Sequence, residues 1–352
     1  MLQINNKERE ELLHLACKNG QFSLIKNLLK AKVDIDAFNT EGLSPLHIAV
    51  IKGNIEVAKL LICEGASIDL NDSKWGSTPL LYACQNGRTK IVKMLLENGS
   101  DINAKSDEGS TAIHFAAQSG KPELIDFLLQ KGFDINCEND FLKTPLHKTL
   151  LHWRYPSGKS TSLYEKVKLI IEKGGNINSI ESENVTPLMY AIMAHDVSVV
   201  KLFISLGANV NHGQNDNKLT PLHCAAYFKG EEHEKMIQAL IKNGAKINAV
   251  GGSKLMTPLH SNVFNKGAIE SARALLENGA SLTMKDHQNN TALQQAIKYG
   301  NTKFIKLVLE LQPSLVASLN TSQDFPIEYP LQLQDESALK MITYHCHKYA
   351  FI

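Results

Sequence analysis

Histidine and cysteine are the residues of this sequence whose side chains could most directly do chemistry. Imidazole nitrogens bind metals and exchange protons near neutral pH, and a thiolate is a strong nucleophile. Six histidines recur along most of the chain, at His14, His47, His114, His147, His223 and His260. A separate cluster, His345-Cys346-His347, combines two residue types that bind zinc. The cysteines are at positions 17, 63, 84, 137, 224 and 346. The sequence therefore raises two possibilities, a metal site and a cysteine nucleophile.

The context of these residues favours structural roles. Each recurring histidine closes a similar tetrapeptide, and units stacked side by side would hold these side chains apart. Neighbouring residues of a helix or strand point in different directions, so His345, Cys346 and His347 would not converge on one ion. Motifs of the types GxxxxGK[ST], GxGxxG and GxSxG do not occur in the sequence. We expect no metal, no cofactor and no catalytic residues.

The tetrapeptides belong to a repeat that covers most of the chain. Their first residues are Ser44, Thr78, Thr111, Thr144, Thr186, Thr220, Thr257 and Thr291. Successive starts differ by 34, 33, 33, 42, 34, 37 and 34 residues. Self-similarity at a period near 33 residues is typical of repeat architectures and predicts the fold before any local propensity does.

Each part of the repeat has a physical role. Serine or threonine caps the first helix of the unit, and proline follows at the first helical position, where no N–H is needed. A leucine begins the buried stripe, which small residues such as Ala49 and Ala83 continue. Apolar residues at spacings of three and four predict a second helix, as in Ile91-Val92 and Leu95-Leu96. A glycine such as Gly99 then closes the unit before a polar turn.

These motifs resemble those of the ankyrin repeat family, whose consensus contains T-P-L-H-x-A-A and G-A-D-V/I-N. The resemblance implies an all-α solenoid of about ten helix-turn-helix units, with β-hairpin fingers between them and a cap at each end. We expect a single domain over residues 1–352, with an N-terminal capping repeat at 1–43 and core repeats at 44–311. Residues 312–352 would form an atypical C-terminal cap, in which Asp324 and Phe325 begin a tenth unit.

Composition restricts the classes of partner. The net charge is +1, and only four of the 37 basic residues are arginine. Neither property favours binding to nucleic acid or to an anionic membrane. The sequence predicts no membrane span and no cleaved signal peptide, and its scattered cysteines predict free thiols in a reducing compartment. We expect a cytoplasmic monomer. The abundance of lysine and asparagine also suggests an AT-rich genome, so a bacterial effector that is secreted into a host cell is one possible origin.

The resemblance also implies where a partner would bind, because variable residues of the family flank the finger turns and follow the small residues of the first helix. Large aromatic residues are unusual in such turns, and they are enriched among residues that dominate protein interfaces. Trp75 could instead fold back onto a neighbouring finger. The candidate partner-binding residues in the repeats are Phe38, Thr40, Trp75, Ser77, Gln85, Asn86, Lys105, Asp107, Glu108, Gln118, Phe141 and Lys143.

The fifth unit carries an insertion at about residues 150–163. From Thr144 to Gly174 there are 30 residues, against 21 from Ser44 to Gly65. The extra residues are predicted to lie between the two helices of the unit. They include Trp153, Arg154 and Tyr155, which we add to the partner-binding candidates. A smaller insertion near Gly230 and His233 is predicted in the seventh unit, and both insertions could form a second contact surface or a brace.

The sequence thus predicts a non-catalytic protein–protein interaction module, acting as an adaptor, a scaffold or an inhibitor, with a host-targeting effector as a further alternative. It would bind a partner protein through its concave face and finger tips. The alternative is an enzyme, for example a cysteine-dependent one, with its site in the fifth-unit insertion or the C-terminal segment.

Overall fold

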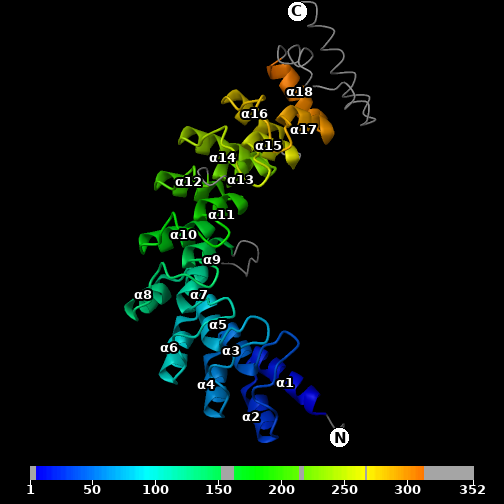
Figure 1. The fold of residues 1–352 in the computed structure, drawn as a ribbon. Helices are drawn as coiled ribbons and strands as arrows, with labels where there is room; N and C mark the ends of the chain where they lie inside the picture. The colour runs from blue at the N-terminus through cyan, green and yellow to red at the C-terminus, as the bar shows by residue number, and fades with distance from the viewer. Residues whose placement is uncertain (1–4, 152–161, 214–217, 266–267, 313–352) are drawn as a thin grey trace, which may run out of the picture. The chain divides into compact units, whose positions relative to one another are not determined.

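The computed structural model describes residues 5–151, 162–213, 218–265 and 268–312. Contacts divide the chain into two compact units, Met1–Glu183 and Asn184–Ile352. Each unit consists of consecutive helix pairs (Figure 1). The helices of the first unit are α1 (Asn6–Asn19), α2 (Phe22–Lys30), α3 (Pro45–Lys52), α4 (Ile55–Cys63), α5 (Pro79–Gln85), α6 (Thr89–Glu97), α7 (Ala112–Ser119), α8 (Pro122–Gln130), α9 (Pro145–Leu151) and α10 (Leu163–Glu172). Those of the second unit are α11 (Pro187–Met193), α12 (Val197–Ser205), α13 (Pro221–Tyr227), α14 (Glu231–Lys242), α15 (Pro258–Phe264), α16 (Ile269–Glu277), α17 (Ala292–Lys298) and α18 (Thr302–Leu311).

The first helix of each repeat begins where the tetrapeptide predicts. In eight repeats the first helix starts one residue after the Ser or Thr cap, so the predicted helix starts are confirmed. At α3, the Ser44 hydroxyl accepts a hydrogen bond from the His47 backbone N–H at 3.4 Å. A proline at the first helical position costs nothing there, because that N–H has no partner within the helix.

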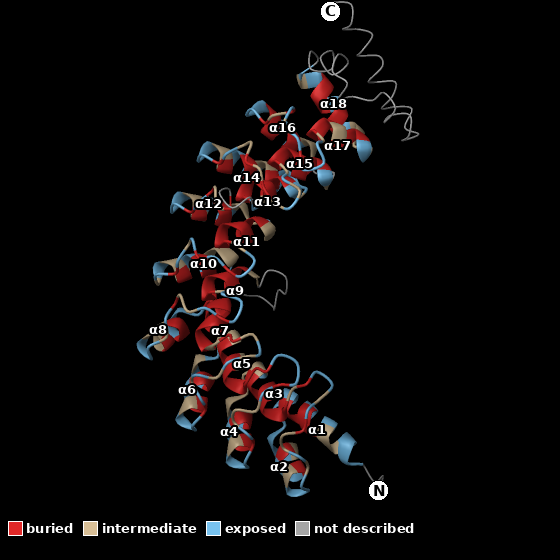
Figure 2. Ribbon diagram, in the orientation of Figure 1, coloured by how far each residue is buried: buried red, intermediate tan, exposed pale blue. Residues whose placement is uncertain are grey.

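Helices pack into two rows within each unit. The odd-numbered helices contact one another in chain order, α1 to α9 in the first unit and α11 to α17 in the second. The even-numbered helices form a second row beside them (Figure 1). Buried residues line the faces between the rows (Figure 2). Ala49, Ala83, Ala116 and Ala225 are completely buried, which allows the odd-numbered helices to approach closely. The all-α repeat architecture is therefore confirmed.

Recurring histidines connect several first helices to the finger that follows. At His47, the ring Nδ1 accepts a hydrogen bond from the Ser44 N–H at 3.3 Å, and Nε2–H donates to the Ser77 carbonyl at 3.0 Å. The same pair of bonds occurs at His114, His223 and His260. This arrangement confirms the predicted structural role, and it requires the neutral ring.

The fingers are tight turns closed mainly by side-chain oxygens. The Asp72 carboxylate accepts hydrogen bonds from the N–H groups of Lys74, Trp75 and Ser77 at 2.7–2.8 Å. Between residues 5 and 312, outside the three internal gaps, the only β-pairings are isolated bridges at Gly251–Met256 and Lys285–Thr291. The predicted hairpin fingers are thus short turns, because the aspartate or asparagine side chain takes N–H groups that a longer ladder would use.

The two insertions have different structural consequences. In the fifth repeat α9 ends at Leu151 and α10 begins at Leu163, which confirms that the extra residues lie between the two helices. Residues 152–161, and with them Trp153, Arg154 and Tyr155, lie outside the described residues. In the seventh repeat the extra residues lengthen α14, which has 12 residues where α12 has nine. There His233 Nε2 lies 2.5 Å from His195 Nδ1 of the sixth repeat, and this contact connects the sixth and seventh repeats.

Lys166 compensates for the displaced start of α10. In earlier repeats, a residue at the start of the second helix covers the C-terminal end of the first helix of the repeat before it, as Lys121 at the start of α8 covers Gly87 at the end of α5. In the fifth unit the Lys166 stem covers Gly120, whose φ of +69° suits glycine, and its ammonium donates to the Gln118 carbonyl at 2.7 Å. Burial lowers the pKa of Lys166. A cation at a helix C-terminus also interacts favourably with the helix dipole.

Nine helix pairs are described, and the predicted tenth unit, with the C-terminal cap and His345-Cys346-His347, lies outside the described residues. The expectation of one domain over 1–352 stays a prediction. None of the described helices has the length and apolar character that crossing a membrane requires.

Candidate functional site

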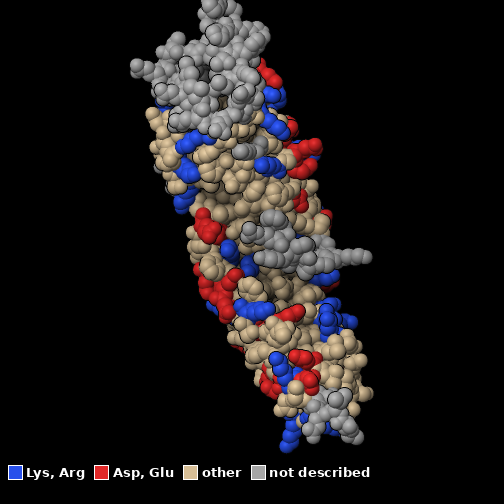
Figure 3. All heavy atoms as spheres, turned by 90° about the vertical axis from the view of Figure 1, so that its right-hand side faces the viewer, with Lys and Arg blue, Asp and Glu red and all other residues tan. Residues whose placement is uncertain are grey.

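The first unit contains a pocket of about 470 Å³ between the fingers and the first helices of its third, fourth and fifth pairs. A volume of this size lies within the range of ligand-binding pockets. The helices α5, α7 and α9 form one wall, and the fingers that precede α5, α7 and α9 form the other. Acidic and basic side chains are interspersed on the described part of the face that carries the odd-numbered helices (Figure 3).

Seven of the predicted partner-binding residues line this pocket: Trp75, Ser77, Gln85, Asp107, Glu108, Gln118 and Lys143. They come from three repeats, and most of them occupy equivalent positions when the repeats are aligned. Five others are described but do not line the pocket: Phe38, Thr40, Asn86, Lys105 and Phe141. Phe38 and Phe141 are about half exposed, at 47% and 45%, so both remain available on the finger surface.

Hydrogen bonds between successive fingers fix the positions of the pocket residues. The Trp75 carbonyl accepts a hydrogen bond from the Asp107 N–H at 2.9 Å. One repeat further on, the Glu108 carbonyl accepts from the Asp140 N–H at 3.0 Å. The Trp75 N–H is itself bound to the Asp72 carboxylate at 2.8 Å. Because its backbone is held on both sides, Trp75 presents its ring from a rigid turn, and 62% of the residue is exposed.

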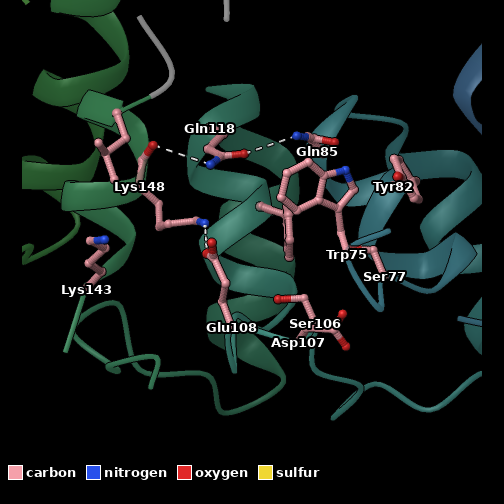
Figure 4. Close-up of a pocket in the computed structure, with 12 residues that line it drawn as sticks. Trp75, Ser77, Tyr82, Gln85, Ser106, Asp107, Glu108, Gln118, Lys143 and Lys148 are labelled. Atoms are coloured by element: carbon pink, nitrogen blue, oxygen red, sulfur yellow. Dashed lines mark hydrogen bonds and ion pairs between the residues drawn. The ribbon is translucent and has the colours of Figure 1, made fainter. Parts of the chain in front are cut away.

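A row of side-chain amides crosses the first helices of the pocket. The Gln85 Nε2 group donates to Gln118 Oε1 at 3.5 Å, and Gln118 Nε2 donates to the Lys148 carbonyl at 3.3 Å (Figure 4). The Lys148 ammonium contacts the Glu108 carboxylate at 2.7 Å. These contacts connect α5, α7, α9 and the finger that precedes α7, so they set the shape of the pocket. Ser77 and Gln118 are buried and present little surface to a partner.

Sequence reasoning missed several lining residues, among them Tyr82, Phe115 and Lys148. Each lies within a first helix rather than at a finger or after the small residues. Phe115 and Tyr82 occupy equivalent positions four residues after Thr111 and Thr78, so the repeat alignment contained a signal. Lys148 continues this register at Thr144 and is directed to the pocket by its pairing with Glu108.

Burial makes several of the described histidines and cysteines poor acid–base or nucleophilic groups. Burial lowers the pKa of His114 to about 4, and burial also lowers the pKa of His47. Burial raises the pKa of the Cys17, Cys84 and Cys224 thiols to about 12, which disfavours the thiolate. Cys63, by contrast, is exposed. The part of the chain that the structure describes contains no group of three or more metal-binding side chains.

Comparison with protein families identifies the repeat. A model described as "Ankyrin repeats (3 copies)" matches residues 2–72, 64–139, 100–153 and 158–251. A second model, "Ankyrin repeats (many copies)", matches residues 262–309. These matches cover most of the chain, including every residue that lines the pocket.

Several named proteins share this sequence pattern. The chain is 37% identical over 104 residues to the B-cell lymphoma 3 protein homolog of Mus musculus, which covers 28% of this chain and 23% of that protein. It is 38% identical over 92 residues to mouse protein phosphatase 1 regulatory subunit 27, covering 26% of this chain and 59% of that protein. The E3 ubiquitin-protein ligase KEG of Arabidopsis thaliana is 26% identical over 322 residues, which is 88% of this chain and 17% of the ligase. The chain thus spans less than two thirds of the length of each relative. Because the family models match most of its repeats, the chain belongs to the ankyrin repeat family.

Proposed function

We propose that this protein is a non-catalytic binding module, an adaptor, scaffold or inhibitor, that holds a partner protein in the pocket of its first unit. Ankyrin repeats generally mediate protein–protein interaction, and the mouse phosphatase relative is named as a regulatory subunit. The observation that carries the proposal is the exposed Trp75 ring, held on a rigid finger beside a pocket of about 470 Å³. Large aromatic side chains next to well-formed pockets often dominate binding energy.

The partner is proposed to contact the finger tips as well as the pocket. Phe38 and Phe141 are exposed on two other fingers of the same unit and extend the contact surface beyond the pocket. Phe141 carries the Lys143 ammonium at 5.1 Å from its ring centre, so it is already partly covered. We therefore expect Phe141 to contribute less binding energy than Trp75. A role for Trp153, Arg154 and Tyr155 in a second contact surface stays a prediction.

A capture experiment tests the proposal. Immobilised wild-type protein and the Trp75→Ala and Phe264→Ala variants are incubated with the same cell lysate, and retained proteins are quantified by mass spectrometry. Phe264 is the control, since it lies in the second unit and is about one third exposed. A partner of the pocket should be retained by the wild type and by Phe264→Ala but not by Trp75→Ala. Equal retention of every protein by all three would contradict the proposal.

The absence of catalysis is part of the proposal, and a thiol probe tests it. Among the described cysteines, the raised pKa values at positions 17, 84, 137 and 224 support inert thiols. The alternative, a cysteine-dependent enzyme, predicts rapid labelling of one cysteine at neutral pH. We expect only slow labelling, first at the exposed Cys63. Rapid labelling that stops when one other cysteine is replaced would favour the enzyme.

We further propose that the protein acts as a monomer in the cytoplasm, and in a host cell if it is a bacterial effector. The five described cysteines are free, which supports a reducing compartment. Light scattering of the purified protein tests the monomer, and fluorescence microscopy of a tagged chain in its source cell and in a candidate host tests the location.

A further inference from the structure

The two acidic side chains of the finger that precedes α7, Asp107 and Glu108, have different surroundings. Glu108 is paired with Lys148 at 2.7 Å and is therefore neutralised within the pocket. Asp107 is exposed, and in the described ranges its carboxylate forms no ion pair or side-chain hydrogen bond. It packs against Gly76, where any added Cβ would overlap the carboxylate. A negative charge is thus held beside the backbone of Trp75 without a partner of its own.

The aromatic rings differ in the same way. The Lys148 ammonium lies 5.9 Å from the centre of the Phe115 ring, and Lys143 lies 5.1 Å from that of Phe141. Over the residues that the structure describes, no cation lies over Trp75, although indole is the ring that attracts cations most strongly. Trp75 and Asp107 lie in successive fingers at one end of the pocket, defined here as the Trp75–Asp107 end. The indole extends towards Gln85 and Gln118, and the open carboxylate lies beside the Trp75 backbone (Figure 4).

The charges that line the rest of the pocket do not cancel this end. Lys148 is already paired with Glu108. Lys143, the other cation, lies on the far side of the Glu108–Lys148 pair from Trp75 (Figure 4). A partner that covered both Trp75 and Asp107 with apolar groups alone would take water from the Asp107 carboxylate without replacing its hydrogen bonds, which is costly. A cationic group avoids this cost.

We propose that the Trp75–Asp107 end binds an arginine side chain of the partner protein. An arginine side chain is long enough for its aliphatic stem to lie on the indole while its planar guanidinium donates paired hydrogen bonds to the Asp107 carboxylate. Flanking partner residues would occupy the remainder of the pocket, towards Lys143. This inference rests on the proposed function and specifies which chemistry the pocket recognises.

Selection from a random-peptide display library tests the inference on the full chain. The library is selected separately against the wild type, Trp75→Ala, Asp107→Asn and Asp140→Asn. Asp140 is a matched control, since it packs against Gly109 as Asp107 packs against Gly76, but it does not line the pocket. We expect arginine to be enriched at one peptide position with the wild type and Asp140→Asn, and this enrichment to be lost with Asp107→Asn.

A titration of the best selected peptide then measures the effect. Asp107→Asn should weaken binding by about tenfold, and an arginine-to-citrulline change in the peptide should weaken it similarly, because both remove one partner of the same charged contact. The two changes together should cost little more than either alone. Melting temperatures of the variants show that folding is unchanged.

The outcomes separate the inference from the proposed function. Peptides that depend on Trp75 but carry no arginine, or that bind Asp107→Asn equally well, would overturn the arginine assignment and leave the binding module intact. Selection of lysine in place of arginine would also overturn it. If no selected peptide depends on Trp75, both the inference and the pocket as a partner site fail.

Discussion

The two units place different side chains at the same position of their first helices. Seven residues after the capping threonine, the third and fourth repeats, in the first unit, have Gln85 and Gln118, whereas the seventh and eighth repeats, in the second unit, have Tyr227 and Phe264. The glutamines bind each other and the neighbouring helix, and so define a pocket with fixed polar groups. The second unit presents rings instead, and Phe264 meets Tyr299 edge to face with 6.0 Å between ring centres.

The ends of these helices differ as well. In the first unit the charged Lys166 donates to the Gln118 carbonyl, whereas in the second the neutral amide of Asn265 donates to the Tyr227 carbonyl at 2.8 Å. The comparison teaches that the repeat determines the backbone, while a few positions of constant register determine what each unit can bind. We expect polar, directional recognition in the first unit and apolar contact in the second.

Acid should separate the two units most strongly. Burial lowers the pKa values of His114 in the first unit and of His223 and His233 in the second to about 4, and the charge of His195 adds to the effect at His233. A folded-state pKa below the unfolded value means that stability is complete above pH 6.5 and is lost as the pH falls towards 4. At pH 5 the loss is about 2 kcal/mol for each of these histidines.

Hydrogen exchange at pH 7 and pH 5, corrected for intrinsic rates, measures this loss. Amides of α13 and α14 should lose more protection than those of α7, because two of the three histidines lie there. Replacing His233 with glutamine should reduce the difference. Equal protection of both units at pH 5 would contradict the expectation.

Removal of Lys166, whose side chain covers the C-terminal end of α7, should have a slightly smaller effect on stability. Lys166→Ala removes the bond to the Gln118 carbonyl and the stem over Gly120, and we expect it to lower the free energy of unfolding by about 2 kcal/mol. Lys166→Met keeps the stem and should recover part of the loss. The control is Lys168→Ala on the exposed face of the same helix, with an effect within about 0.5 kcal/mol. Urea unfolding curves decide, and equal stability of Lys166→Ala and Lys168→Ala would refute the role of Lys166.

The amide row should contribute less again. Gln118→Ala leaves the Lys148 carbonyl without its side-chain donor and should destabilise the first unit by about 1 kcal/mol. It should also weaken binding of pocket-dependent peptides, because Gln118 helps to set the pocket's shape. Phe264→Ala should leave peptide binding unchanged. Peptide binding that is insensitive to Gln118→Ala would show that the amide row does not shape the site.

The ion pair should have the smallest effect. The Glu108 side chain is 43% exposed and that of Lys148 15%, so Glu108→Gln should change the free energy of unfolding by less than about 1 kcal/mol. The change should shrink further in 1 M salt. A loss above about 2 kcal/mol, independent of salt, would indicate that the pair behaves as a buried one.

Much of the fold followed from the period, because each motif acts locally. The capping residue, the proline and the closing glycine each fix a helix end by short-range contacts, so helix positions could be predicted within the eight matched repeats. The candidate site followed in part, since the finger positions of Trp75 and Asp107 are set by the same register. Lys148 and Lys166 did not follow, because their positions depend on the partners Glu108 and Gln118 that lie in other repeats.

The most direct test of the account is a titration of the captured partner with the wild type, Trp75→Ala, Phe264→Ala and Trp153→Ala, alongside the melting temperature of each. The account predicts that Trp75→Ala weakens binding by about 2 kcal/mol or more and melts with the wild type, because an exposed finger residue contributes little packing. Phe264→Ala and Trp153→Ala should bind normally. A Trp75→Ala protein that binds normally, and above all one that also melts much earlier, would show that the ring is structural and that the pocket of the first unit is not the partner site.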